Sequence, residues 1–263
     1  MRISSKTWNN YISILRAIND KAVKELEAWI KVYGTDKGIT DLSEIVDIDG
    51  NNLIDAAYIM TQKYGNASAA ISAEMYQALA DLSGVPIESP ILADNASYGE
   101  VVKTVQGVYK TSQNPGEVSS AVSRLVKRTG ADTTLINAKR DGAQFAWIPS
   151  GDTCAFCITL ASRGWQYMSK NALKNGHAEH IHSNCDCNYA IRFDNKSSVA
   201  GYDPDKYKEQ YDDAEGNTPE EKINSMRRKY YAENRAEILA EKADRYAERV
   251  ELNSSQAEET NVN

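Results

Sequence analysis

Apolar positions in the N-terminal half of the chain recur at helical spacing. Over residues 7–33, large apolar side chains return every three or four positions between polar and charged ones, and the pattern ends at Gly34. Helix starts are predicted at two Asn N-caps, Asn66 and Asn114, and helix ends at glycines, among them Gly130. These signals predict an all-helical first half, with helices over 7–33, 52–64, 67–82, 98–112, 115–128 and 132–141.

The pattern changes after Gly142. Residues 144–148 and 188–193 have the composition and alternation of short strands, and 157–163 fit a short helix. The two strands flank one cysteine-rich stretch, so we expect them to pair as a small antiparallel sheet. All 3 Phe of the chain lie in this region, which suits a small module whose core is supplemented by a bound metal.

The chain is therefore expected to be an α+β protein that is mainly helical. A chain of 263 residues can form one large domain or two smaller ones. The predicted organisation is a helical region, a metal-stapled β/α module, a pair of charged C-terminal helices and a disordered polar tail. In residue numbers these are 1–131, 132–200, 201–252 and 253–263.

Charge is unevenly distributed. The net charge is −7, and 201–263 contribute most of it, with 10 Lys and Arg against 16 Asp and Glu. Such a balance gives no global drive to coat nucleic acid. Residues 103–140 are locally basic, and their cations form the best candidate surface for DNA or an acidic partner. They are Lys103, Lys110, Arg124, Lys127, Arg128, Lys139 and Arg140.

Neither a secretory signal nor a bilayer-spanning apolar run is present in the sequence. We therefore expect a soluble protein made in a reducing cytosol, with no membrane partner. In that compartment clustered cysteines more often bind metal than form structural disulfides.

All 4 Cys and all 3 His of the chain lie between Cys154 and Cys187. Their order is C-x2-C, a spacer, and then H-x2-C-x-C. Zinc prefers four tetrahedral thiolate or imidazole ligands in paired short spacings. The pattern predicts a structural Zn²⁺ site with five candidate ligands for four places. The favoured set is Cys154, Cys157, Cys185 and Cys187, with His182 as the substitute.

Three other uses of these residues compete. Disulfides require an oxidising compartment, and a thioredoxin-like C-x2-C site requires a βαβ pattern that the sequence lacks. A catalytic zinc with Glu179 as base would resemble a deaminase site, whose signature places H-x-E before C-x2-C; here the order is reversed. His177 and His180 are expected to be exposed or to lie just outside the ligand set.

Residues 145–157, 161–165 and 180–187 resemble the phage minor head proteins of the MuF-type head-morphogenesis family. The signature of that family is a C-x2-C followed by a loop and H-x2-C-x-C, and the specific likeness covers about 132–193. Asp186 stands where many relatives have Arg. The resemblance implies a non-enzymatic minor capsid protein, present in few copies in the procapsid and associated with the portal.

The same resemblance implies partners and a location. Portal protein and capsid or scaffold proteins would be the partners, with a role in DNA packaging or delivery in some members. The protein would lie in the host cytoplasm during assembly and then in the virion head. The alternative from another class is a zinc-dependent enzyme or toxin-like module acting on nucleic acid or nucleotides, with Glu179 as its base.

Overall fold

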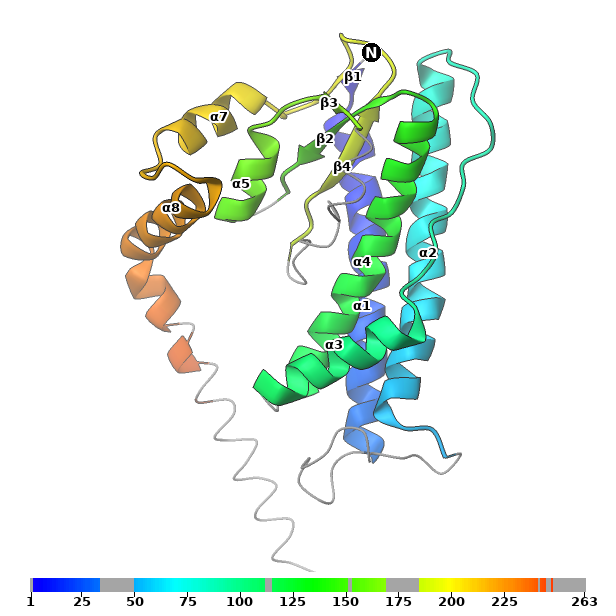
Figure 1. Ribbon diagram of the computed structural model, residues 1–263, viewed down its shortest axis with the longest axis vertical. Helices are drawn as coiled ribbons and strands as arrows, with labels where there is room; N and C mark the ends of the chain where they lie inside the picture. The colour runs from blue at the N-terminus through cyan, green and yellow to red at the C-terminus, as the bar shows by residue number, and fades with distance from the viewer. Residues whose placement is uncertain are drawn as a thin grey trace, which may run out of the picture.

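A bundle of long helices forms one side of the molecule (Figure 1). The computed structural model describes residues 2–33, 50–111, 115–150, 153–168, 185–240, 242–244 and 247. Helices α1, α2 and α4 run side by side, and α3 crosses α4 near its start. Their bounds are α1 Ser5–Tyr33, α2 Leu53–Leu82, α3 Tyr98–Thr111 and α4 Pro115–Arg140. The predicted C-cap Gly34 and the predicted N-cap Asn114 lie outside the described residues.

A small antiparallel sheet packs against the upper part of this bundle. Strand β2 (Gln144–Ile148) is central, between β3 (Gln166–Tyr167) and β4 (Asn188–Arg192). In the register of β2 and β4, Trp147 lies opposite Tyr189. The predicted pairing of the two strands and the α+β class are therefore confirmed.

The N-terminus forms a second strand pair that the sequence pattern did not predict. Strand β1 (Arg2–Ile3) runs parallel to β5 (Ser198–Val199), and Ala200 N–H donates to the Ile3 carbonyl at 2.9 Å. A two-residue strand is too short to carry an alternating pattern. This pair ties the start of α1 to the chain that leaves the sheet.

Two predicted helix breaks were wrong, because α2 runs through Asn66 and α4 runs through Gly130. The glycine in α4 serves close packing instead of helix termination. A Cβ on Gly130 would lie 2.9 Å from Ser72 Oγ and 3.2 Å from the Ser68 carbonyl, and it would overlap Ser68 Oγ. Small residues on α2 and α4 thus let the two backbones approach, and local sequence cannot distinguish this use of glycine from a C-cap.

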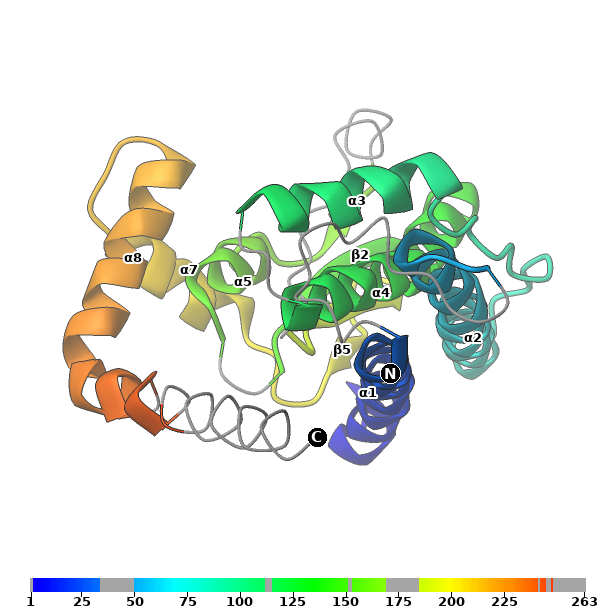
Figure 2. The same cartoon turned by 90° about the horizontal axis from the view of Figure 1, so that it is seen from below.

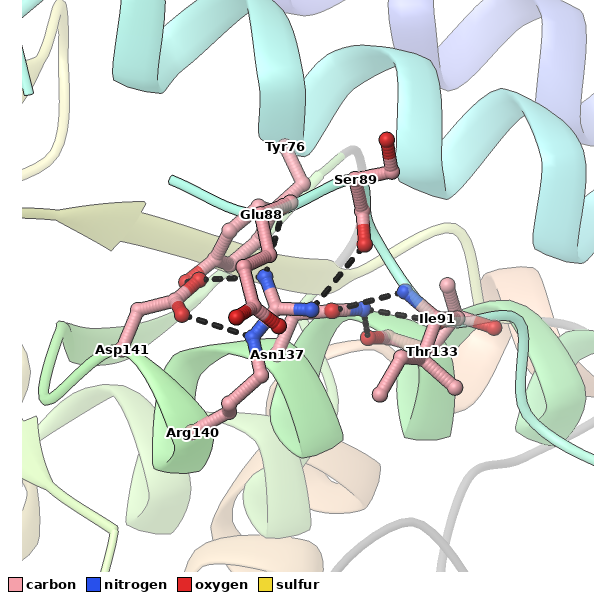
Figure 3. Close-up of polar contacts among 8 residues, drawn as sticks. All are labelled: Tyr76, Glu88, Ser89, Ile91, Thr133, Asn137, Arg140 and Asp141. Carbon is pink, nitrogen blue, oxygen red and sulfur yellow. Dashed lines mark hydrogen bonds and ion pairs between the residues drawn. The ribbon is translucent and has the colours of Figure 1, made fainter. Parts of the chain in front are cut away.

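The irregular segment between α2 and α3 is held on α4 by side chains (Figure 3). Asn137 is fully buried, accepts from Ile91 N–H at 2.9 Å and donates to the Ile91 carbonyl at 2.8 Å. Arg140 donates to the carbonyls of Ser89 and Glu88 at 3.0 and 2.9 Å. These bonds satisfy backbone groups that have no helix or strand partner.

Helix α1 contributes to two hydrophobic cores. Its first half, including Trp8 and Leu15, packs under the sheet, and its second half, including Leu26, packs inside the bundle with Val101 and Val122. The predicted boundary at 131/132 falls inside the continuous helix α4. The domain division itself stays a prediction.

The chain after the sheet forms helices on the far side of the module. They are α7 (Pro204–Asp212) and α8 (Pro219–Glu233), and 235–240 are also helical. Neither α7 nor α8 has a buried residue. The predicted disordered tail, 253–263, lies outside the described residues.

Gly130→Ala is expected to lower the free energy of unfolding by about 1–3 kcal/mol, because the added methyl overpacks the α2–α4 contact. The matched control is Gly107→Ala in α3, where a Cβ meets nothing within 4 Å. That change should stabilise the protein by up to about 1 kcal/mol through helix propensity. Urea unfolding measures both, and equal effects of the two substitutions would contradict the close-packing account.

Candidate metal centre

The fold brings the two cysteine pairs together across one strand pair. Helix α5 (Ala155–Ala161) follows β2 after a short connection, with Cys154 as its N-cap and Cys157 in its first turn. Because β4 is antiparallel to β2, its first residue lies beside the last residue of β2, in the pair Ile148 and Asn188. Cys185 and Cys187 come directly before β4, so they lie close to the start of α5, which follows β2.

Three of the four sulfurs form a compact group. The Sγ atoms of Cys157, Cys185 and Cys187 all lie within 4.8 Å of one another, and the Cys157 and Cys185 Sγ atoms are 3.2 Å apart. Sulfurs around a tetrahedral zinc are roughly 3.8 Å apart, since Zn–S bonds are about 2.3 Å long. A disulfide would need about 2.05 Å. These three residues are therefore close enough to hold a metal ion after small shifts.

Cys154 lies beside this group. Its Sγ accepts a hydrogen bond from Cys157 N–H at 3.4 Å, as a thiol N-cap of α5. Contact with Cys154 is also the largest influence that raises the pKa of the Cys157 thiol. We refer to Cys154, Cys157, Cys185 and Cys187 as the thiol cluster.

Contacts within the thiol cluster shift the pKa values of its members in opposite directions. Contacts with Cys154, Cys185 and Cys187 raise the pKa of Cys157 far above its ordinary range, while hydrogen bonds from Cys157 and Cys187 lower the pKa of Cys185 to about 3. Several adjacent thiolates repel one another unless a cation lies among them. A divalent ion is the group that would favour all of them as thiolates.

The surroundings of the thiol cluster suit a closed metal site. Ser150 N–H donates to Cys187 Sγ at 3.3 Å, the kind of N–H···S contact that stabilises a metal-bound thiolate. Cys157 and Cys187 are 1% and 5% exposed, so bulk water has little access to their sulfurs. The rings of Trp147 and Tyr189 pack edge to face at 4.6 Å in the same core.

A charged bridge joins the thiol cluster to the helical bundle. Asp186 Oδ2 accepts from Arg16 Nε of α1 at 2.8 Å, and its Oδ1 lies 3.8 Å from Lys127 Nζ of α4. Lys127 also donates to the Cys185 carbonyl at 2.9 Å. Desolvation lowers the pKa of Lys127, and the charges of Asp186 and Cys185 partly oppose that shift.

Sequence reasoning missed this bridge. The Arg16–Asp186 and Lys127–Cys185 contacts join residues 170 and 58 positions apart, and no periodic pattern signals such pairs. Lys127 is one of the seven cations of the candidate DNA surface within residues 103–140. Its side chain is 11% exposed, and its bonds point toward the thiol cluster.

Two further cations of that candidate surface are also engaged within the protein. Arg128 pairs with Glu100 at 3.1 Å, and Arg140 pairs with Asp141 at 2.7 Å. Arg124 is half-buried, whereas Lys103, Lys110 and Lys139 are exposed. The seven residues therefore do not present seven free charges on one face.

The predicted histidines cannot be placed against the sulfurs. His182, the substitute ligand, lies outside the described residues, as do His177, His180 and Glu179. The choice between Cys154 and His182 as the fourth ligand therefore stays a prediction.

Fold and site define a mainly helical α+β protein with a partly buried thiol cluster, three of whose cysteines lie close enough to hold a metal ion. A family model described as VG15 protein matches residues 2–214. The chain therefore belongs to the VG15 protein family, a family of viral or phage gene products. The match begins at β1, includes the thiol cluster and ends before α8.

The family match is not accompanied by a similar curated protein or solved structure. No curated protein and no solved structure matches the chain significantly. Among the described helices, none combines the length and the apolar character needed to cross a membrane.

Lys127→Ala is expected to lower the free energy of unfolding by about 1–3 kcal/mol, since it removes the donor to the Cys185 carbonyl and one of the cations facing Asp186. Lys103→Ala, at an exposed position of α3, is the control and should change stability by less than about 0.5 kcal/mol. Chemical denaturation compares the two variants. A Lys127 variant as stable as the control would argue against the bridge.

Proposed function

We propose that this protein is a structural component of a phage or prophage head, a minor capsid protein of the head-morphogenesis type that associates with the portal. The observation that carries the proposal is the thiol cluster, whose C-x2-C and H-x2-C-x-C spacing resembles the MuF-type proteins. Membership of a family of viral or phage gene products supports the same reading. Portal protein and capsid or scaffold proteins are the proposed partners, with a contribution to DNA packaging or delivery.

In this proposal the thiol cluster holds one structural Zn²⁺. The proposed ligands are Cys154, Cys157, Cys185 and Cys187, with His182 as the substitute for one of them. Bound zinc would neutralise the thiolates and fix α5 against the start of β4. The protein's own groups prepare the site, because Ser150 N–H and Cys157 N–H point at sulfur and Lys127 anchors the Cys185 carbonyl.

A non-enzymatic role is part of the proposal. A catalytic zinc keeps an open coordination position and a nearby base, whereas four thiolates make a closed set. The nearest described carboxylate in the motif, Asp186, is held by Arg16 and faces Lys127. Both features favour a structural use of the metal over zinc-dependent hydrolysis.

Purified protein is expected to contain about one zinc per chain by elemental analysis. Cys187→Ser should lose the metal and unfold the region around β2 and β4, because metal binding and folding are coupled at such sites. Ser162→Ala, at the other end of α5, is the control and should retain the metal. Fully folded wild-type protein without bound metal would refute the zinc site.

The fourth ligand and the enzyme alternative are tested by paired variants. Comparing the zinc content of Cys154→Ser and His182→Ala identifies the fourth ligand, since only loss of a true ligand should release the ion. Glu179→Gln should leave head assembly unchanged, whereas a zinc hydrolase would lose its activity.

The head-assembly role is tested by incorporation. Tagged wild-type protein should co-purify with procapsids and with portal protein, and Cys187→Ser should be depleted from both. Wild-type protein that is absent from assembled heads would contradict the proposed function.

A further inference from the structure

The C-terminal helices project away from the bundle. Helix α8 lies at one margin of the molecule in both views, far from α1 and α2 (Figures 1 and 2). It contacts the body through α5 and has no buried residue. We call residues 219–240 the C-terminal arm. The arm lies beyond residues 2–214, so the family match does not account for it.

A basic run followed by two aromatic residues marks the middle of the arm. Arg227, Arg228 and Lys229 are consecutive and exposed, and Tyr230 and Tyr231 follow, 54% and 42% exposed. Within the described part of the chain, none of the three cations forms an ion pair. By contrast, Lys208 of α7 pairs with Asp212, and Lys222 donates to the Tyr211 and Asp212 carbonyls.

The acidic groups at the start of α8 do not compensate this charge. Glu221 accepts from the backbone N–H groups of Asn217 and Thr218 in the capping box. Between 222 and 235, Glu233 is the one acid. The middle of the arm is therefore a local concentration of positive charge within the most acidic third of the chain.

A groove runs along the inner side of the arm. Its volume is about 750 Å³, and Arg228, Lys229 and Tyr230 form part of one wall. The lining also includes Ile158 of α5 and three acids, Asp213, Glu215 and Glu233. Arg227 and Tyr231 are exposed and do not line the groove, so the basic and aromatic surface extends from the groove lining to the side of the arm outside it.

We propose that the C-terminal arm binds the phosphate backbone of nucleic acid, with the cations on phosphates and the tyrosines stacking on unpaired bases. Successive helical residues are rotated by about 100°, so three consecutive cations cover much of the helix circumference. A helix that docks on a protein partner presents an apolar stripe instead. Cations beside exposed aromatic rings are the usual features of surfaces that bind single strands.

This inference is independent of the α3–α4 basic surface and goes beyond the proposed head-assembly role. Arg128 and Arg140 of that surface are paired within the protein, whereas the arm cations are available. If the protein enters heads but does not bind nucleic acid, the nucleic-acid proposal is wrong and the head-assembly proposal stands. The two outcomes are distinguishable because incorporation and nucleic-acid binding are measured separately.

The test measures binding of full-length protein to fluorescent DNA, as a single strand and as a duplex of the same sequence, over a range of salt concentrations. Wild-type protein should bind at low salt, with the single strand bound more tightly than the duplex. The triple variant Arg227→Gln, Arg228→Gln, Lys229→Gln should weaken binding about ten-fold or more. It should also make the slope of log affinity against log salt concentration less negative by about 2 for the single strand, because three phosphate contacts are lost.

The matched control removes three exposed cations from α3 and α4 with the same change in net charge, through Lys103→Gln, Lys110→Gln and Lys139→Gln. It should leave affinity within about two-fold of wild type, apart from the weak long-range effect of net charge. Equal losses in the two triple variants, or no binding by wild type at low salt, would overturn the proposal.

The tyrosines are tested separately. Tyr230→Ala with Tyr231→Ala should weaken single-strand binding about thirty-fold or more, since two rings are removed and stacking contributes about 1–3 kcal/mol per base, and should leave duplex binding unchanged. Tighter binding of duplex than of single strand by wild type, or no effect of the tyrosine substitutions, would overturn the assigned stacking. Circular dichroism of each variant confirms that the exposed substitutions leave the helices folded.

Discussion

The meeting of two cysteine pairs at one end of the sheet is the constraint on which the module depends. Cys154 and Cys157 follow β2, and Cys185 and Cys187 precede β4, so the sulfurs meet only if the two strands pair antiparallel in the observed register. A register slip by one residue would turn every side chain of β4 to the other face. It would move Tyr189 away from Trp147 and carry the two cysteines out of place.

The same region also ties the module to the helices. Asp186 stands between Cys185 and Cys187 and reaches both α1 and α4, through Arg16 and Lys127. Helix α1 continues from this contact into the bundle core, and β1 at its start pairs with β5. Helices α1, α2 and α4 each contribute to both hydrophobic cores, and the charged bridge and the β1–β5 pair add to this connection between module and bundle.

Sequence alone predicted the parts of the fold that depend on local pattern. The helical first half and the antiparallel pairing of 144–148 with 188–192 follow from periodicity and from the position of the cysteine-rich stretch between the strands. Gly130 was misread because a glycine at a helix end and a glycine at a helix crossing have the same local signal. The contact of Lys127 with the Cys185 carbonyl could not be predicted, because the two residues lie 58 positions apart in the sequence.

The metal that we propose for the thiol cluster would hold α5, β2 and β4 together. Hydrogen–deuterium exchange, followed peptide by peptide with and without a strong chelator, measures this directly. Removing the metal should expose the amides of 144–148 and 188–192, while those of 118–126 in the bundle core stay protected. Unchanged protection of β2 and β4 after complete removal of the metal would contradict the account.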